Sequence, residues 1–167
     1  MQILNNLLLP EKFCKHERHI TVSGYIFNKS LTKVVLLHHK KLHKWMAAGG
    51  HIEVNELPHE AISREIKEEV GVEADFIDSM IAAKFDSVNE WKMPSPYFAM
   101  MQVIPETKTN PEHLHYDYSY ILVARTKKLN PKPDESQKVQ WFSLPEVLKL
   151  ETFPIVPKIC KAILSKK

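Results

Sequence analysis

The N-terminal half of the chain opens with two apolar segments of strand character. Residues 19–27 (HITVSGYIF) and 34–38 (VVLLH) are rich in β-branched and aromatic side chains, which is typical of strands. Between them, the sequence Asn28-Lys29-Ser30 supplies residue types that favour turns. The pattern therefore predicts a β-hairpin.

The apolar period then lengthens to that of a helix. Ile62, Ile66 and Val70 recur at four-residue steps, which predicts a helix over residues 57–70. In chain order, the remaining predicted elements are a strand within 74–83, a buried strand at 97–104, a strand at 116–124, a loop at 130–134, a short strand at 139–142, the start of a helix at 144–150 with Pro145 in its first turn, and a closing helix within 153–164. This order predicts an α/β or α+β layered domain with a mixed sheet.

Length and composition fit an ordinary globular protein. A chain of 167 residues suits a single domain, here residues 1–167 with residues 1–18 as an N-terminal extension. Because 44% of the residues are apolar and 26% are charged, disorder is not expected. The net charge is only +3 and the basic residues are scattered, so a solvated surface is favoured over a nucleic-acid-binding patch.

The N-terminal segment lacks the features of a secretory signal. Its apolar run Leu7-Leu8-Leu9 is stopped by Pro10 and has no basic region before it. No apolar stretch approaches the roughly 18 residues of a membrane span, so no membrane partner is expected and the cytoplasm is the default location. Cys14 and Cys160 form no CxxC pair, and two free thiols are the simplest expectation.

The segment from residue 49 to 72 (GGHIEVNELPHEAISREIKEEVGV) is the most informative part of the chain. It contains three of the four glycines, and its second half falls in the predicted helix. Glu65, Glu68 and Glu69 share one side of that helix. Like charges at this spacing destabilise a helix by roughly a few tenths of a kcal/mol per pair, and a hard divalent cation removes the conflict. Taken alone, an acidic helix face is more often merely solvated.

The longer pattern resembles the Nudix box at every fixed position. Gly50 is followed after five residues by Glu56, after seven more by Arg64-Glu65, and then by Glu68-Glu69 and Gly71-Val72. The preceding stretch LHKWMAAGGHIE and the later stretch KVQWFSLPEVLKL also resemble this family. The chain departs from it at Ala48, where the family often has proline before the glycine pair.

The resemblance implies a Nudix-type α/β/α sandwich with a mixed β-sheet and with its box at residues 50–72. It also implies Mg²⁺, or Mn²⁺ as a substitute, bound by Glu65, Glu68, Glu69 and the backbone carbonyl of Gly49. Arg64 would orient the catalytic carboxylates, and Glu56 would hold the motif together through that arginine. Glu65, or an acid outside the box, would take the proton from the attacking water.

The implied function is hydrolysis of the pyrophosphate linkage in a nucleoside diphosphate joined to another moiety. A binding module that senses a nucleotide or nucleotide sugar without cleaving it is the alternative, and degraded boxes are its usual sign. An isomerase on the same fold would need a suitably placed reactive cysteine. Nudix subfamilies are distinguished by residues after the box, and Ser87 stands near the place where an ADP-ribose type would carry its proline. Dimers are common in the family, so a homodimer is a candidate assembly.

A second polar cluster lies at residues 112–117 (EHLHYD). On a strand, His113, His115 and Asp117 would share one face. They are interpreted either as an extra ligand or base facing the helix of the box, with Glu112 as the leading candidate, or as outward polar positions of a half-exposed strand, which is favoured.

Other polar and aromatic positions have an ordinary interpretation beside a functional one. His51 and Glu53 either touch substrate or are polar positions on a strand. The loop with His38, His39, Lys40, Lys41, His43 and Lys44 is interpreted as solvated rather than as a basic rim for phosphates. Trp45, Tyr97, Phe98 and Tyr118 are interpreted as core rather than base-stacking side chains, and Met100-Met101 as core packing.

Overall fold

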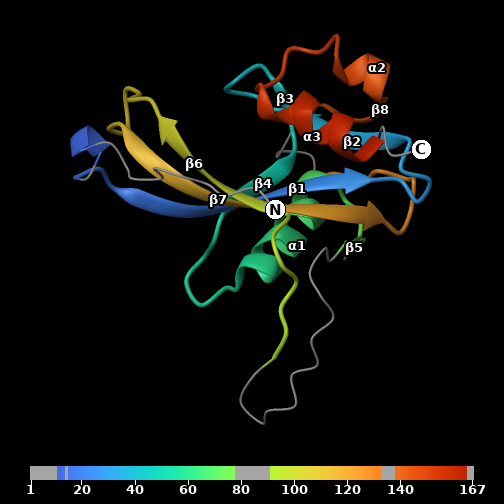
Figure 1. Cartoon of the computed structure of the whole chain (residues 1–167), viewed down its shortest axis with the longest axis horizontal. Coiled ribbons are helices and arrows are strands. Elements are labelled where there is room, and N and C mark those ends of the chain that lie inside the picture. The colour runs from blue at the N-terminus through green and yellow to red at the C-terminus, as the bar shows by residue number, and fades with distance from the viewer. Residues whose placement is uncertain (1–10, 14, 78–90, 133–137, 165–167) are drawn as a thin grey trace.

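The protein is a three-layered α/β domain in which one mixed sheet separates two helical layers (Figure 1). The computed structural model describes residues 11–13, 15–77, 91–132 and 138–164. In chain order its elements are η1 (Glu11–Phe13), β1 (Arg18–Phe27), β2 (Lys33–His38), β3 (Trp45–Met46), β4 (Ala48–His51), α1 (Pro58–Glu69), β5 (Ala74–Phe76), β6 (Phe98–Ile104), β7 (His113–Ala124), β8 (Lys138–Ser143), α2 (Leu144–Val147) and α3 (Ile155–Leu164). Among these residues, no helix is both long and apolar enough to cross a bilayer.

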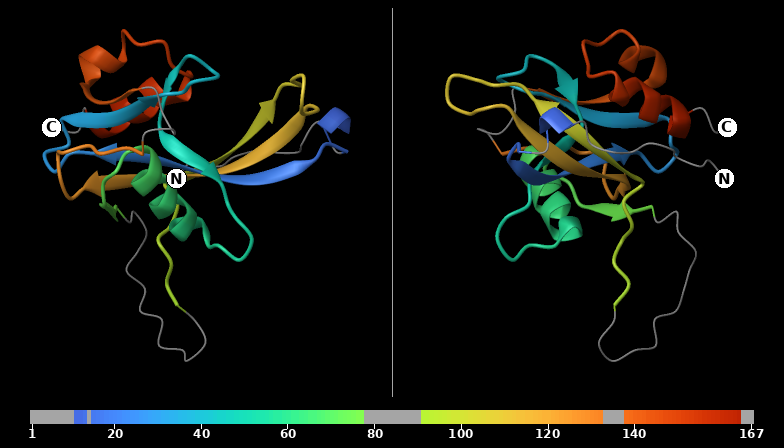
Figure 2. Two further views of the ribbon diagram at one scale, coloured as in Figure 1. Left: turned by 180° about the vertical axis from the view of Figure 1, so that it is seen from behind. Right: turned by 60° about the vertical axis from the view of Figure 1, so that its left-hand side comes forward.

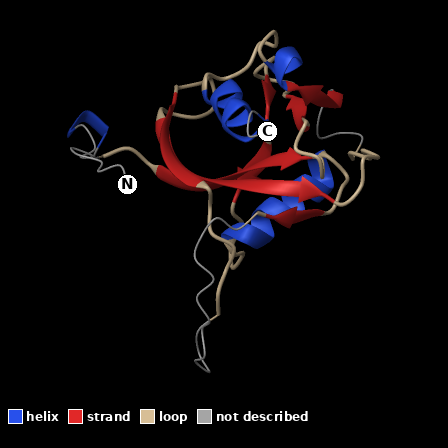
Figure 3. Cartoon of the chain, turned by 45° about the vertical axis from the view of Figure 1, so that its right-hand side comes forward, coloured by secondary structure: helices blue, strands red, loops and turns tan. Residues whose placement is uncertain are grey.

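The sheet is built around two long strands, β1 and β7, which run parallel over ten consecutive residue pairs. All other pairings between the named strands are antiparallel. Along one edge of β1, the segment 21–24 pairs with β4 and Ile26–Phe27 pairs with β2. Along the far edge of β7, its first part pairs with β6 and its last three residues pair with β5. The strongly curved sheet that results is seen in Figure 3.

The two faces of the sheet bury different cores. Val22, Ile26, Tyr120 and Leu122 pack with Ile62 and Ile66 of α1 on one face. Tyr25, Phe27 and Ile121 pack with the residues of α3 on the other. Because side chains alternate along a strand, consecutive residues of β1 and β7 enter opposite layers. At one end, β6 and the first halves of β1 and β7 extend past the helices (Figure 2).

The predicted order of elements is confirmed, with differences at boundaries. The hairpin turn is held by Asn28, whose Oδ1 accepts hydrogen bonds from the N–H groups of Thr32 and Lys33. The helix predicted at 144–150 is the single turn α2, in which Glu146 accepts hydrogen bonds from the hydroxyl and the N–H of Ser143. The strand predicted within 74–83 appears as β5, and residues 78–83 lie outside the described residues.

The prediction that residues 97–104 form a buried strand is wrong about burial. The strand is present as β6, but its residues alternate between half-buried and exposed. Met101 is 40% exposed, so the interpretation of Met100-Met101 as core packing is also wrong for Met101. The reason is that β6 lies in the part of the sheet that extends past the helices, where one of its faces meets solvent.

Candidate functional site

The predicted box forms a strand–loop–helix unit against β1. β4 carries Gly49 and Gly50, the loop carries Glu56, and α1 carries Arg64 and the glutamates at 65, 68 and 69. The helix begins with Pro58 in its first turn, and the N–H of Leu57 donates to Glu60 Oε2 at 2.9 Å. Proline is well tolerated there because the first N–H groups of a helix have no partner within it.

Arg64 lies at the centre of the unit and binds three segments. Its Nε and Nη2 donate to the two carboxylate oxygens of Glu56 at 2.8 and 2.9 Å. Its Nη2 also donates to the carbonyl of His51 at 3.1 Å, and its Nη1 donates to Glu65 Oε1 at 2.8 Å. A planar guanidinium suits such a bidentate arrangement, which lysine cannot reproduce. Arg64 therefore ties β4 and the loop to the turn of α1 that carries Glu65.

The charges of this group stabilise one another. Hydrogen bonding to Arg64 holds the pKa of Glu56 below its ordinary value. The same bonds to Glu56 and then Glu65 raise the pKa of Arg64. Both side chains therefore stay ionised at neutral pH.

The glycine pair lets two carboxylates approach the backbone of β4. The N–H of Gly49 donates to Glu69 Oε2 at 2.9 Å, and Glu69 is only 9% exposed. A Cβ on Gly50 would lie 2.3 Å from Glu65 Oε1, and a Cβ on Gly49 would lie 2.0 Å from the carbonyl oxygen of Val22. Side chains at these two positions would thus occupy the space of a carboxylate and of the β1 backbone.

Glu68 is the most solvent-facing of the three helix carboxylates. Its Oε1 accepts a hydrogen bond from Lys132 Nζ at 2.7 Å, and its Oε2 lies 3.5 Å from Arg64 Nη1. Lys132 holds the pKa of Glu68 below its ordinary value. The three carboxylates thus come to one end of α1, and each has a different anchoring partner: Arg64, Lys132 and the N–H of Gly49.

The C-terminal end of α1 is held by the segment before β8. Lys132 N–H donates to the carbonyl of Glu68 at 2.8 Å, and Asn130 N–H donates to the carbonyl of Val70 at 3.0 Å. Gly71 follows with a φ of +71°, a conformation that favours glycine, and a Cβ there would lie 1.8 Å from the carbonyl oxygen of Asn130.

A second polar cluster, which we call the histidine face, lies on the opposite side of the sheet from α1. It consists of His19 of β1, His51 of β4, and His113 and His115 of β7. Next to it, the buried carboxylate of Asp117 accepts hydrogen bonds from three hydroxyls, those of Thr21, Ser23 and Ser119, at 3.2, 2.8 and 2.6 Å.

Both interpretations of His113, His115 and Asp117 need correction. The three residues share a face, as predicted, but the neighbouring residues Tyr120 and Leu122 are the ones that pack toward α1. None of the three faces the helix of the box, and they are not outward polar positions either: His113 is 7% exposed, Asp117 is 3% exposed and His115 is half-buried. The sequence does not predict that His19, Thr21 and Ser23 contact the histidines and Asp117 of β7. These contacts depend on the parallel pairing of β1 with β7, which no local pattern indicates.

The histidine rings are packed closely. His51 Nε2 lies 3.3 Å from His19 Nδ1, and His113 Nε2 lies 3.1 Å from His115 Nε2. Burial, with smaller effects of the neighbouring rings, lowers the pKa of His115 to about 4 and also lowers that of His51. Charging these rings is therefore unfavourable at this site.

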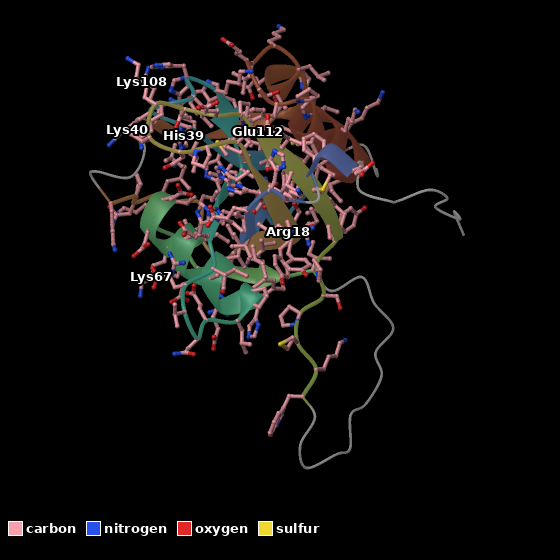
Figure 4. All side chains as sticks on the ribbon, turned by 90° about the vertical axis from the view of Figure 1, so that its left-hand side faces the viewer. Arg18, His39, Lys40, Lys67, Lys108 and Glu112 are labelled. Atoms are coloured by element: carbon pink, nitrogen blue, oxygen red, sulfur yellow. The ribbon has the colours of Figure 1, made fainter. Side chains whose placement is uncertain are left out.

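Glu112 is placed away from the α1 carboxylates. Its Oε1 lies 2.9 Å from Nε2 of His16, in the N-terminal segment. Figure 4 shows Glu112 on the strand side of the molecule, apart from Lys67 of α1. The structure therefore does not bring Glu112 to the predicted site, and its role as an additional acid stays a prediction.

A surface pocket of about 440 Å³ connects the histidine face with the loop of the box. It is lined by His19, Ile20, His51, Ile52 and Glu53. Another hollow, of about 290 Å³, lies between α1 and β5 and includes Ser63, Lys67 and Arg125. Only the first pocket adjoins the glycine-bearing strand β4 through His51, so it is the better candidate for a ligand.

The remaining predicted positions fit their ordinary interpretation. Trp45, Tyr97 and Phe98 pack against the core on the α3 side, and Tyr118 packs against the core on the α1 side. The loop at 39–44 is largely exposed. Cys160 is a free, fully buried thiol whose pKa is raised by burial to about 12, so it does not serve as a reactive thiolate. Cys14 and Ser87 lie outside the described residues.

Comparison with known proteins identifies relatives over nearly the whole chain. The model of the NUDIX domain matches residues 17–161. A crystal structure of a NUDIX-family hydrolase from Clostridium perfringens is 30% identical with a TM-score of 0.70, and the match covers 89% of this chain and 97% of that one. No curated protein sequence matches the chain.

More distant structures share the fold. The dihydroneopterin triphosphate pyrophosphohydrolase of E. coli is 14% identical with a TM-score of 0.65, over 91% of this chain and 99% of that one. A C. elegans Ap4A hydrolase is also 14% identical, with a TM-score of 0.63 over 89% of this chain and 99% of that one. At this identity the likeness concerns the architecture.

Proposed function

Since this chain belongs to the Nudix hydrolase family, we propose that it hydrolyses the pyrophosphate linkage of a nucleoside diphosphate joined to another moiety, with a divalent cation as cofactor. The observation that carries the proposal is the anchoring of Glu56 and Glu65 on Arg64, beside Glu69 on the N–H of Gly49. This arrangement gives each fixed polar position of the box a defined partner.

The donor set suits a hard cation. Glu65, Glu68, Glu69 and the carbonyl of Gly49 offer oxygen ligands, which Mg²⁺ and Mn²⁺ prefer. Three carboxylates, those of Glu56, Glu65 and Glu68, pair with the two basic side chains Arg64 and Lys132, and Glu69 accepts the N–H of Gly49. Bound Mg²⁺ would neutralise phosphate oxygens and lower the pKa of a coordinated water.

The protein's own residues would position and accept a proton. Arg64 holds Glu65 by Oε1, and we assign that carboxylate as the acceptor of the proton from the attacking water. Glu56 acts as a positioning residue because it fixes Arg64 with two hydrogen bonds. Attack at phosphorus would release two phosphorylated products, and such chemistry depends on positioning and electrostatics rather than on a covalent nucleophile.

The alternative is a module that binds a nucleotide or nucleotide sugar without cleaving it. The intact set of anchored carboxylates favours catalysis over this alternative. The substrate class is proposed as a nucleotide-like small molecule.

The test is a product assay by mass with the full chain and Mg²⁺ or Mn²⁺. Nucleoside triphosphates, dinucleoside polyphosphates, ADP-ribose, NADH and nucleotide sugars are offered in water enriched in ¹⁸O. We expect turnover of at least one compound, with the label in a phosphate product, and loss of turnover in Glu69→Gln. Glu73→Gln is the matched control, because Glu73 is exposed and pairs with Arg125. Binding without turnover across the whole panel would support the sensor instead.

A further inference from the structure

The histidine face gathers metal-ligand atoms more closely than the box does. The ring nitrogens that His19, His51 and His115 offer all lie within 4.8 Å of one another. Within the described part of the chain, no other group of three His, Cys, Asp or Glu side chains is gathered this closely. The three residues come from three neighbouring strands, β1, β4 and β7, so the sheet itself sets their spacing.

The register explains why these rings meet. His19 is paired directly with His115 in the parallel β1–β7 ladder, and His51 is paired with Thr21, two residues along β1 from His19. All three side chains therefore project from the same face of adjacent strands. A site carried by strands is held more rigidly than one carried by loops.

The separation between two of the ligand atoms already fits a tetrahedral metal ion. At a Zn–N bond of about 2.0–2.1 Å, two tetrahedral ligands lie about 3.3–3.4 Å apart. His19 Nδ1 and His51 Nε2 lie 3.3 Å apart. Neutral imidazole nitrogens suit zinc and similar transition metals, whereas the α1 carboxylates suit Mg²⁺.

His19 already has an outer partner of the kind that metal-binding histidines use, and His113 supports the ring of His115. His19 Nε2 lies 3.1 Å from Glu17 Oε1, which leaves Nδ1 directed at His51. His113 is fixed by the carbonyl of Pro111 at 2.9 Å and contacts the ring of His115. Carboxylates and carbonyls in these positions orient the rings and raise their basicity.

We propose that His19, His51 and His115 form a binding site for a Zn²⁺-class transition metal ion, distinct from the oxygen site of the box. Its fourth position opens to solvent at the pocket lined by His19, His51 and Glu53. Asp117 is not a ligand, because its two oxygens accept three hydroxyl hydrogen bonds. Arg64 donates a hydrogen bond to the backbone carbonyl of His51, whose ring would bind the ion. The two sites would therefore be joined through β4.

The test is a Co²⁺ titration of the metal-stripped full chain in excess Mg²⁺, which occupies oxygen sites. We expect one equivalent of Co²⁺ to produce the intense visible absorption of a four-coordinate ion, and Zn²⁺ to displace it. Glu17→Gln should weaken binding about tenfold to 100-fold, and His51→Ala and His115→Asn should weaken it further. His43→Asn is the matched control, since His43 is an exposed histidine with a φ of +52°, which asparagine tolerates.

Three outcomes overturn the proposal: no four-coordinate spectrum in the folded chain, an unchanged spectrum in His51→Ala and His115→Asn, or loss of the spectrum in Glu69→Gln. The last would place the ion in the carboxylate site. Far-ultraviolet circular dichroism of each variant confirms folding, and His51→Ala is the safest variant because His51 is exposed.

Discussion

The strand β4 lies between two polar clusters whose side chains are held by different kinds of partner. On the α1 side, Arg64, Lys132 and the N–H of Gly49 hold the carboxylates, each at its own place. On the other side, the ring nitrogens that His19, His51 and His115 offer lie within 4.8 Å of one another, and a carboxylate, that of Glu17, lies at the far nitrogen of His19. Carboxylates repel one another and need cations to be brought close, whereas imidazoles share hydrogen bonds. The difference suggests that a cation must rearrange the first cluster but can enter the second directly.

The largest expected effect comes from removing the arginine that organises the carboxylates. We expect Arg64→Ala to lower kcat about 100-fold or more, because small displacements of catalytic groups have effects of this size. Arg64→Lys should not restore activity, since a single ammonium cannot bind Glu56, Glu65 and the carbonyl of His51 together. Steady-state kinetics on the substrate found by the product assay provides the measurement. Arg125→Ala is the matched control, because Arg125 is an exposed arginine that also binds two acids, and an equal loss there would refute the special role of Arg64.

A smaller effect is expected from filling the space beneath Glu65. Gly50→Ala would place a methyl group 2.3 Å from Glu65 Oε1, so the carboxylate must move while the backbone stays in place. We expect kcat to fall about tenfold to 100-fold with little change in Tm. In contrast, Gly24→Ala would press on Ile62 and should lower Tm without this loss of kcat. Full activity in Gly50→Ala would show that the position of Glu65 is not critical.

The histidine cluster should make stability depend on pH above the range in which carboxylates titrate. The pKa of His115 is about 4 in the folded chain against 6.5 for the unperturbed side chain. As pH falls from 6.5 toward 4, the unfolded chain gains the proton first, so the free energy of unfolding decreases over this window. We expect about 1 kcal/mol, reduced by the partial exposure of the ring. Urea unfolding in EDTA should show a weaker pH slope in His115→Asn, and an unchanged slope would contradict the assignment.

The smallest effect is expected at Lys132, the exposed basic side chain that pairs with Glu68. Lys132→Met removes the ion pair with Glu68, in which Lys132 is 58% exposed. We expect the free energy of unfolding to change by less than about 1 kcal/mol, as for other surface pairs. Because Lys132 no longer competes for Glu68, a few-fold less Mg²⁺ should give half-maximal activity. A Mg²⁺ titration of initial rates tests this, and a higher Mg²⁺ requirement would indicate that Lys132 assists the cation.

The two clusters also differ in how far the sequence could predict them. The carboxylates, Arg64 and Glu56 lie within fourteen residues, so their spacing on a helix and its loop is visible as a local motif. The order of strands and helices also followed from local periodicity. The histidine face could not be predicted, because it depends on the parallel register that places His19 beside His115, almost a hundred residues away. The same limitation explains why the predicted burial of β6 is wrong. The apolar character of Met101 does not reveal where the helical layer ends.

Because Asn130 and Lys132 cap the C-terminal end of α1, residues 50–72 depend on a distant segment when they are grafted onto another protein. Helix ends ordinarily fray, yet the final turn here, which carries Glu68 and Glu69, is fastened by amides from a segment some sixty residues downstream. Stiffness at the end of α1 that carries Glu68 and Glu69 is thus a property of the whole domain and is not encoded in residues 50–72. A chimera that grafts those residues alone onto another scaffold would inherit the carboxylates but lose their rigidity. In the intact domain, slow amide exchange at Asn130 and Lys132 would be the signature of that rigidity.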